Sequence, residues 1–188
     1  MRIFLNFALF QVAWFACVLG AANGMPWLGP LVVAAVVAYH LKRVPEPRAE
    51  VMLLILAAVI GLVFDSLLVS AGWLTYSSGQ WHPLLAPYWI VAMWIGFATT
   101  LNVSMAWLKG RSYLAFVLGA IGGPLAYLGG AKLGGVSLVD TTAALAALAM
   151  GWALIMPLLM LAAQRLDKWR PAVERRALAT AAGSQGHA

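Results

Sequence analysis

Six long apolar stretches, separated by short polar segments, dominate this sequence. They cover residues 3–22, 28–41, 51–70, 87–108, 113–131 and 139–163. Most of them approach or exceed the roughly 20 residues that a helix needs to cross the ~30 Å hydrocarbon core of a bilayer. The pattern predicts an all-α fold, a polytopic transmembrane bundle of about six helices. We expect a single transmembrane domain over residues 1–170 and a mobile basic tail over residues 171–188.

Two of the stretches need a closer reading. The second is short for a full span, so we expect its helix to begin near Pro26 with Trp27 at the membrane interface. The first resembles a secretory signal peptide in outline, but its apolar run is long for one. We therefore expect the first stretch to be retained as a helix.

The basic residues predict the orientation of the bundle. In a six-helix arrangement, only Lys132 of the twelve Lys and Arg residues falls on one side, and the rest fall on the other. Basic loops stay in the cytoplasm, so both termini are expected there, in a bacterial inner membrane. Tryptophans are expected to mark the two interfaces: Trp27, Trp73, Trp81 and Trp89 the outer one, Trp107 and Trp169 the inner one.

Composition supports the membrane and excludes some functions. Apolar residues make up 63% of the chain and charged residues 10%, against about 45–50% and 25% in soluble domains. The net charge of +6 lies in clusters between apolar runs, so we expect membrane lipid as a partner and no nucleic acid. A second copy or another membrane protein is a further possible partner. Cys17 is the only cysteine and is expected to be a small buried residue.

Asp65 is the most informative polar residue, because an ionisable side chain within a spanning helix is costly and often functional. It lies in the third stretch on a stripe of small residues that includes Gly61, so we expect it to point into the bundle. One interpretation makes it a proton carrier, catalytic group or cation site. The other makes it structural, paired with Lys132 or bonded to backbone amides. The outer segment between residues 73 and 87 is polar but uncharged, and we expect it to lie on the membrane surface as a cap. His82 in this segment is a second catalytic candidate.

Other polar residues lie in or beside the apolar stretches. Asn6, Gln11 and Asn102 are intramembrane candidates that favour helix packing over chemistry. His40 is expected to be an interfacial residue. The sequence has no recognisable metal-ligand spacing and no phosphate-binding loop, so we predict neither a metal nor a cofactor.

Glycines recur through residues 119–135 on either side of Pro124. Small residues at this spacing allow close helix packing. A proline behind Gly122 and Gly123 can instead break the helix and expose backbone carbonyls to a substrate or ion. The sequence leaves both interpretations open.

Three segments resemble a known family. They are PYWIVAMWIGFATTLNVSMAW at residues 87–107, GGPLAYLGG at 122–130, and the opening residues Asn6, Phe10, Gln11 and Trp14. The chain resembles, over nearly its whole length, small bacterial membrane proteins of the family called domain of unknown function 2878. The resemblance marks Gln11, Trp14, Asn102, Pro124 and Tyr127 as family-like positions and implies no catalytic residue. Genes of this family lie near those for cyclopropane-type fatty-acid modification, which implies a role around membrane lipids.

Three functions from different classes follow from these features. The first is an enzyme or accessory subunit in membrane-lipid (fatty-acid) modification, with Asp65 and His82 facing a lipid site. The second is a small proton-coupled transporter that uses Asp65 and a broken fifth helix. The third is a non-catalytic scaffold that holds another membrane protein through its glycine-rich faces. Family association favours the first.

Overall fold

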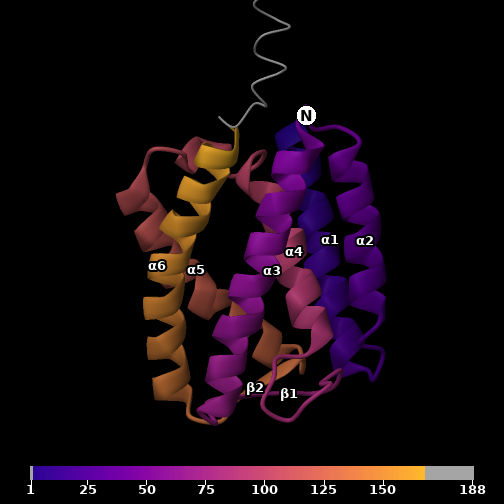
Figure 1. Cartoon of the computed structure of the whole chain (residues 1–188). Coiled ribbons are helices and arrows are strands. Elements are labelled where there is room, and N and C mark those ends of the chain that lie inside the picture. Colours follow the sequence, from indigo (N-terminus) through magenta and orange to yellow (C-terminus); the bar gives the residue numbers. More distant parts are fainter. Residues whose placement is uncertain (1, 168–188) are drawn as a thin grey trace, which may run out of the picture.

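The computed structural model describes residues 2–167, which form a single helical bundle (Figure 1). Its elements are α1 (Arg2–Ala22), α2 (Leu28–Leu41), α3 (Pro47–Ser70), β1 (Leu74–Tyr76), α4 (Tyr88–Leu101), a 3-10 turn (Ala106–Leu108), α5 (Ser112–Lys132), β2 (Val136–Leu138) and α6 (Thr141–Asp167). The six α-helices confirm the predicted fold class. The tail predicted at residues 171–188 lies outside the described residues.

The helices fall into two length classes. Within the described chain, four are long and apolar enough to cross a membrane: α1 over Ile3–Ala22, α3, α5 and α6. The other two, α2 and α4, have 14 residues each, which is about 21 Å at 1.5 Å per residue. This is less than the ~30 Å of a bilayer core, so the loops that flank α2 and α4 complete the thickness of the bundle.

Helix α4 lies at the centre of the bundle. It packs against α1, α2 and α3 and touches α6, while α5 packs mainly against α6. Contacts between α1 and α5 are sparse. The start of α1 and the end of α6 lie at the same end of the bundle, and β1 and β2 lie at the opposite end (Figure 1). This arrangement agrees with an even number of spans, whereas the side of the membrane that each end faces remains a prediction.

The fourth apolar stretch is not the continuous helix that residues 87–108 suggested. Helix α4 ends at Leu101, and the chain turns through residues 102–105 before the 3-10 turn. The Asn6 side chain of α1 explains this end, because its amide donates to the Thr99 carbonyl (3.1 Å) and its oxygen accepts from the Ser104 N–H (3.2 Å). These bonds satisfy backbone groups that a helix end leaves unpaired.

A small antiparallel sheet closes the end of the bundle opposite the termini. Leu74 pairs with Leu138 and Tyr76 with Val136. Leu74 and Tyr76 point inward and are buried, whereas Thr75 between them is exposed, as the two-residue period of a strand requires. The sequence predicted a polar surface cap here but no strands. The sheet inserts Tyr76 into the core.

Glycines let large aromatic rings lie directly against helix backbones. A Cβ added at Gly61 would lie 2.1 Å from Trp94, one at Gly123 would lie 2.3 Å from Trp152, and one at Gly151 would lie 2.2 Å from a Phe64 ring atom. Small residues at such contacts allow close helix packing. Helix α5 runs without a break through Pro124, so close packing is the correct interpretation of its glycines and a broken helix is not.

Candidate functional site

Asp65 is fully buried and accepts three side-chain hydrogen bonds. Its Oδ1 accepts from the Tyr76 hydroxyl at 2.6 Å and from the Tyr127 hydroxyl, and its Oδ2 accepts from the Trp94 indole N–H at 2.7 Å. The donors come from β1, α5 and α4, while Asp65 itself comes from α3. One carboxyl group therefore joins four separate elements, and we call Asp65 and its three donors the Asp65 cluster.

The structural interpretation of Asp65 was wrong about its partners. Lys132, the basic residue expected to pair with it, is exposed at the end of α5, and the bonds of Asp65 go to aromatic side chains instead of backbone amides. Tyr76 lies in β1, outside the spanning helices. Burial raises the pKa of its hydroxyl well above the usual value near 10, and the neighbouring Asp65 and Tyr127 raise this pKa further. Tyr76 therefore remains a neutral donor.

The Asp65 cluster forms part of the wall of a large cavity. This cavity has a volume of about 830 Å³ and is lined from α1, β1, α4, α5, α6 and the turn after α4. We call it the α1–α5 cavity, because most of its exposed lining residues lie on these two helices, Phe7 on α1 and Leu118, Gly122 and Leu125 on α5, with Trp107 of the 3-10 turn beside them. Its mouth therefore lies between two helices that make few contacts with each other and faces the surrounding lipid.

The wall of the α1–α5 cavity is aromatic and uncharged. Ten aromatic side chains line it, including Trp14, Trp94, Tyr127 and Trp152. Among the described residues that line it there is no Asp, Glu, Lys, Arg or His. Trp89, near the start of α4, also lines it and is buried, donating to the Ser78 carbonyl at 2.9 Å, so its ring faces the core of the bundle. The cavity suits a neutral, apolar ligand.

Two polar atoms in this wall have no partner within residues 2–167. They are the indole N–H of Trp152 and the hydroxyl of Ser104, and both are buried. Trp152 stacks on Trp94 with a centroid separation of 4.5 Å, which places it beside the Asp65 cluster. A buried polar group without a partner is costly, so both groups are candidates for binding a ligand.

A second polar cluster lies near the end of the bundle that holds the termini. Glu50 accepts a hydrogen bond from the Asn102 amide at 2.6 Å, and its other oxygen lies 2.9 Å from Nε2 of His40. His40, in the last turn of α2, and Glu50 are both buried, so the His40 side chain is bonded within the bundle. This cluster joins α2, α3 and the end of α4 and lies apart from the cavity lining, which supports a structural role.

The remaining predicted residues are dispersed. Gln11 lines the α1–α5 cavity from α1, and Gly122 lines its mouth from α5. Asn6 caps α4. Gly123 packs against Trp152. Pro124 lies inside the continuous helix α5.

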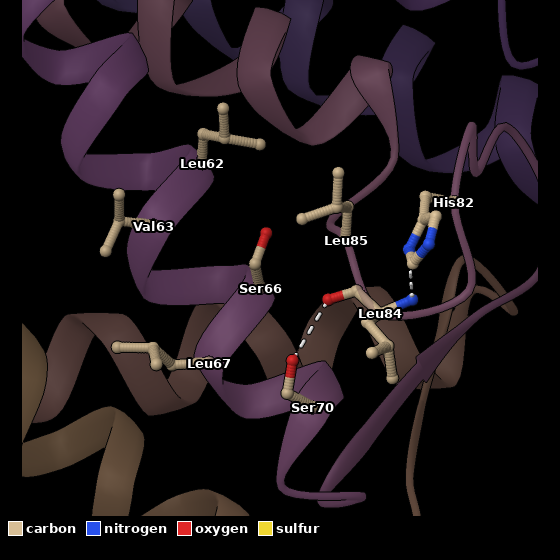
Figure 2. A pocket seen from close by; sticks show the side chains of 8 residues that line it. All are labelled: Leu62, Val63, Ser66, Leu67, Ser70, His82, Leu84 and Leu85. Atoms are coloured by element: carbon tan, nitrogen blue, oxygen red, sulfur yellow. Dashed lines mark hydrogen bonds between the residues drawn. The ribbon is translucent and has the colours of Figure 1, made fainter.

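His82 lies in a separate, shallow pocket between α3 and the segment before α4. Figure 2 shows it beside Leu84, whose backbone N–H donates to the His82 ring at 3.2 Å, while Ser70 donates to the Leu84 carbonyl at 3.1 Å. The residues that line this pocket include Ser66 but not Asp65. The structure therefore does not join the two catalytic candidates, His82 and Asp65, in one site.

Sequence reasoning missed most of the residues that define the site. Tyr76 belongs to the predicted cap, Trp94 and Trp152 belong to predicted apolar stretches, and no pattern in the sequence singled out Glu50. A Tyr or Trp inside an apolar stretch could have indicated these residues, because a buried Tyr hydroxyl or Trp indole N–H usually finds a hydrogen-bond partner. Tyr127 did carry such a signal through its place in the family-like segment.

The fold and the site define a polytopic helical membrane protein with an aromatic cavity beside a buried carboxyl group. The chain belongs to the family of proteins of unknown function DUF2878, whose family model matches residues 3–158. This confirms the resemblance seen in the sequence. No curated protein and no solved structure matches the chain.

Proposed function

We propose that this protein binds an acyl chain of a membrane lipid in the α1–α5 cavity and acts in membrane-lipid modification, as an enzyme or as an accessory subunit. We further propose that it works in the bacterial inner membrane. The observation that carries the proposal is the cavity itself, which is large, aromatic and uncharged and has its mouth toward the lipid.

The size and chemistry of the cavity support a lipid chain. Its volume of about 830 Å³ lies within the roughly 300–1,000 Å³ of small-molecule sites, which are mostly apolar with a few placed polar groups. The uncharged wall disfavours an ion or a charged solute, because a charge moved into it would lose hydration without a partner. The Asp65 cluster supplies the placed polar groups.

The other two functions have weaker support. A proton carrier needs a carboxyl group that exchanges protons along a polar path, whereas Asp65 is fully buried and bonded to three donors. A scaffold would present its glycines to a partner, whereas Gly61, Gly123 and Gly151 are covered by aromatic rings of the same chain.

The test uses two tryptophan substitutions on the same helix. A Cβ added at Gly122 meets nothing within 4 Å, and Gly122 lines the cavity, so Gly122→Trp starts without a clash at the backbone and places its ring at the mouth of the cavity. Ile121 is 55% exposed and does not line the cavity, so Ile121→Trp adds the same ring to the lipid-facing surface. Both variants are compared with the native protein in the native host by mass profiling of membrane lipids.

We expect deletion of the gene to remove or accumulate at least one lipid mass under growth or oxidative stress. Ile121→Trp should restore the native profile, and Gly122→Trp should not, at equal protein abundance. The mass difference would identify the modification. Identical profiles with and without the gene, or full restoration by Gly122→Trp, would overturn the proposal.

A further inference from the structure

We propose that the acyl chain bound in the α1–α5 cavity carries a hydroxyl group along its length, and that Tyr127 and Trp152 recognise this hydroxyl. The inference rests on the proposed function and specifies its ligand class. It starts from the unpaired polar groups of the cavity wall.

Trp152 provides an unused donor. Its indole N–H is buried and has no hydrogen-bond partner within residues 2–167. The ring is held firmly, because it stacks on Trp94 (4.5 Å between centroids, 12° between planes) and lies against the backbone of Gly123. Because an unpaired buried N–H is costly, an oxygen atom of a bound ligand that accepts this hydrogen bond is favoured.

Tyr127 provides an unused acceptor. Its hydroxyl hydrogen is donated to Asp65, so the lone pairs of its oxygen remain available. The side chain lines the cavity, and its oxygen lies within reach of the Trp152 indole N–H, in a geometry too poor to count as a formed hydrogen bond. A ligand group that bonds to both side chains at once must accept from Trp152 and donate to Tyr127, and a hydroxyl does both.

The uncharged wall excludes the ionised alternatives. A carboxylate or phosphate would be buried without a cation, and an ammonium group would be buried without an anion facing the cavity. A carbonyl group accepts from Trp152 but cannot donate to Tyr127. A neutral hydroxyl is the smallest group that satisfies both residues.

The depth of Tyr127 and Trp152 in the bilayer places the hydroxyl along the acyl chain and not at a lipid headgroup. Trp152 lies eleven residues after Thr141, the start of α6, which is about 16 Å along a helix. The hydrocarbon core is ~30 Å thick, so this position lies near its middle. Eight further aromatic side chains and several apolar ones line the rest of the cavity, as a hydrocarbon chain requires.

The experiment uses the purified full-length protein in lipid nanodiscs. The probe is a long-chain fatty-acid methyl ester with a photoreactive diazirine near its end. Four methyl esters of the same chain length compete for labelling: one with a mid-chain hydroxyl, one with a mid-chain methoxy group, one unsubstituted, and one with a hydroxyl at the chain end. The methoxy ester accepts a hydrogen bond but cannot donate one, and the chain-end ester tests depth.

The mid-chain hydroxy ester should compete roughly threefold to tenfold better than the other three, the range expected for one or two additional hydrogen bonds. Trp152→Phe keeps an aromatic ring against Gly123 and removes the N–H, so it should reduce this preference. Trp27→Phe is the matched control, because Trp27 is 55% exposed before the start of α2 and does not line the cavity.

The possible outcomes separate the two proposals. Equal competition by the hydroxy and unsubstituted esters, or better competition by the chain-end ester, overturns the inference and leaves acyl-chain binding intact. Labelling that does not decrease in Gly122→Trp overturns the proposed function as well. The comparison of the four esters on the native protein needs no variant, so it remains decisive if Trp152→Phe does not fold.

Discussion

At the residue scale, the main finding is that Asp65 is bonded to aromatic donors instead of a cation. Three donors from three elements surround one carboxyl group, which satisfies its oxygen atoms inside the bundle as buried polar groups require. The position of Asp65 on an inward stripe of small residues could be predicted from the sequence. Its partners could not, because Tyr76, Trp94 and Tyr127 are 11, 29 and 62 residues away and only the fold brings them together.

Replacing Asp65 by asparagine tests this arrangement. The amide has only one oxygen, so its NH2 group must face either the Trp94 N–H or the two tyrosine hydroxyls. We expect Asp65→Asn to lower the free energy of unfolding by about 1–3 kcal/mol, the cost of a buried donor without an acceptor. Thermal unfolding in detergent measures this effect.

Asp140→Asn is the control for that experiment. Asp140 is exposed and accepts from the Ala143 N–H at the start of α6, a capping role that asparagine fills equally well. It should leave the unfolding temperature nearly unchanged. Equal effects of the two substitutions would contradict the proposed role of the three donors.

The raised pKa of Tyr76 gives a pH-dependent prediction. Because burial and the neighbouring Asp65 and Tyr127 raise this pKa above its usual value near 10, the folded state holds the proton more tightly than the unfolded state. The contribution of the protonated Tyr76 hydroxyl to stability is complete below about pH 10 and is lost as the pH rises further. We expect the unfolding temperature to fall above pH 10, and to fall less steeply in Tyr76→Phe.

Tyr113→Phe is the matched control, because Tyr113 is 82% exposed at the start of α5. Its profile between pH 8 and pH 11 should follow that of the native protein. A steep loss above pH 10 that is identical in all three proteins would assign the transition to other groups.

At the scale of the elements, the apolar stretches predicted the helices well and their ends less well. The number of helices and the long spans follow from hydrophobic length alone, which a single sequence displays. The end of α4 at Leu101 depends on Asn6, which is 93 residues from the carbonyl it binds, and the sheet depends on pairing between segments about 60 residues apart. Neither long-range contact is visible in a local pattern.

The glycines of α5 give the sharpest prediction at this scale, because neighbouring glycines have opposite surroundings. A Cβ at Gly123 would lie 2.3 Å from Trp152, whereas one at Gly122 would meet nothing within 4 Å. We expect Gly123→Ala to destabilise the bundle by about 1–3 kcal/mol through overpacking. Gly122→Ala should be neutral or stabilising by up to about 1 kcal/mol, because alanine favours the helix. Thermal unfolding of both variants checks the difference in sign.

At the scale of the whole molecule, the two polar clusters differ in their position relative to the cavity. The His40–Glu50–Asn102 cluster joins α2, α3 and the end of α4, and none of its residues lines the cavity, whereas the Asp65 cluster joins four elements beside the cavity. Interhelical hydrogen bonds contribute modestly inside a membrane, so side-chain packing contributes most of the attraction between the helices, and the rings against Gly61, Gly123 and Gly151 are part of this packing. The lipid-facing mouth is the place where this packing is left incomplete.

The orientation of the bundle is the last whole-molecule prediction, and two serines near the ends of α5 test it. Ser112 begins α5, and Ser137 lies in β2 just beyond its other end; both are exposed. The native Cys17 is fully buried, so single cysteines introduced at these serines should dominate labelling by a membrane-impermeant maleimide. Because basic loops stay in the cytoplasm, we expect Ser137→Cys to react in intact cells and Ser112→Cys to react only after the membrane is opened. The reverse pattern would place the termini outside, and equal labelling in intact cells would contradict a span by α5.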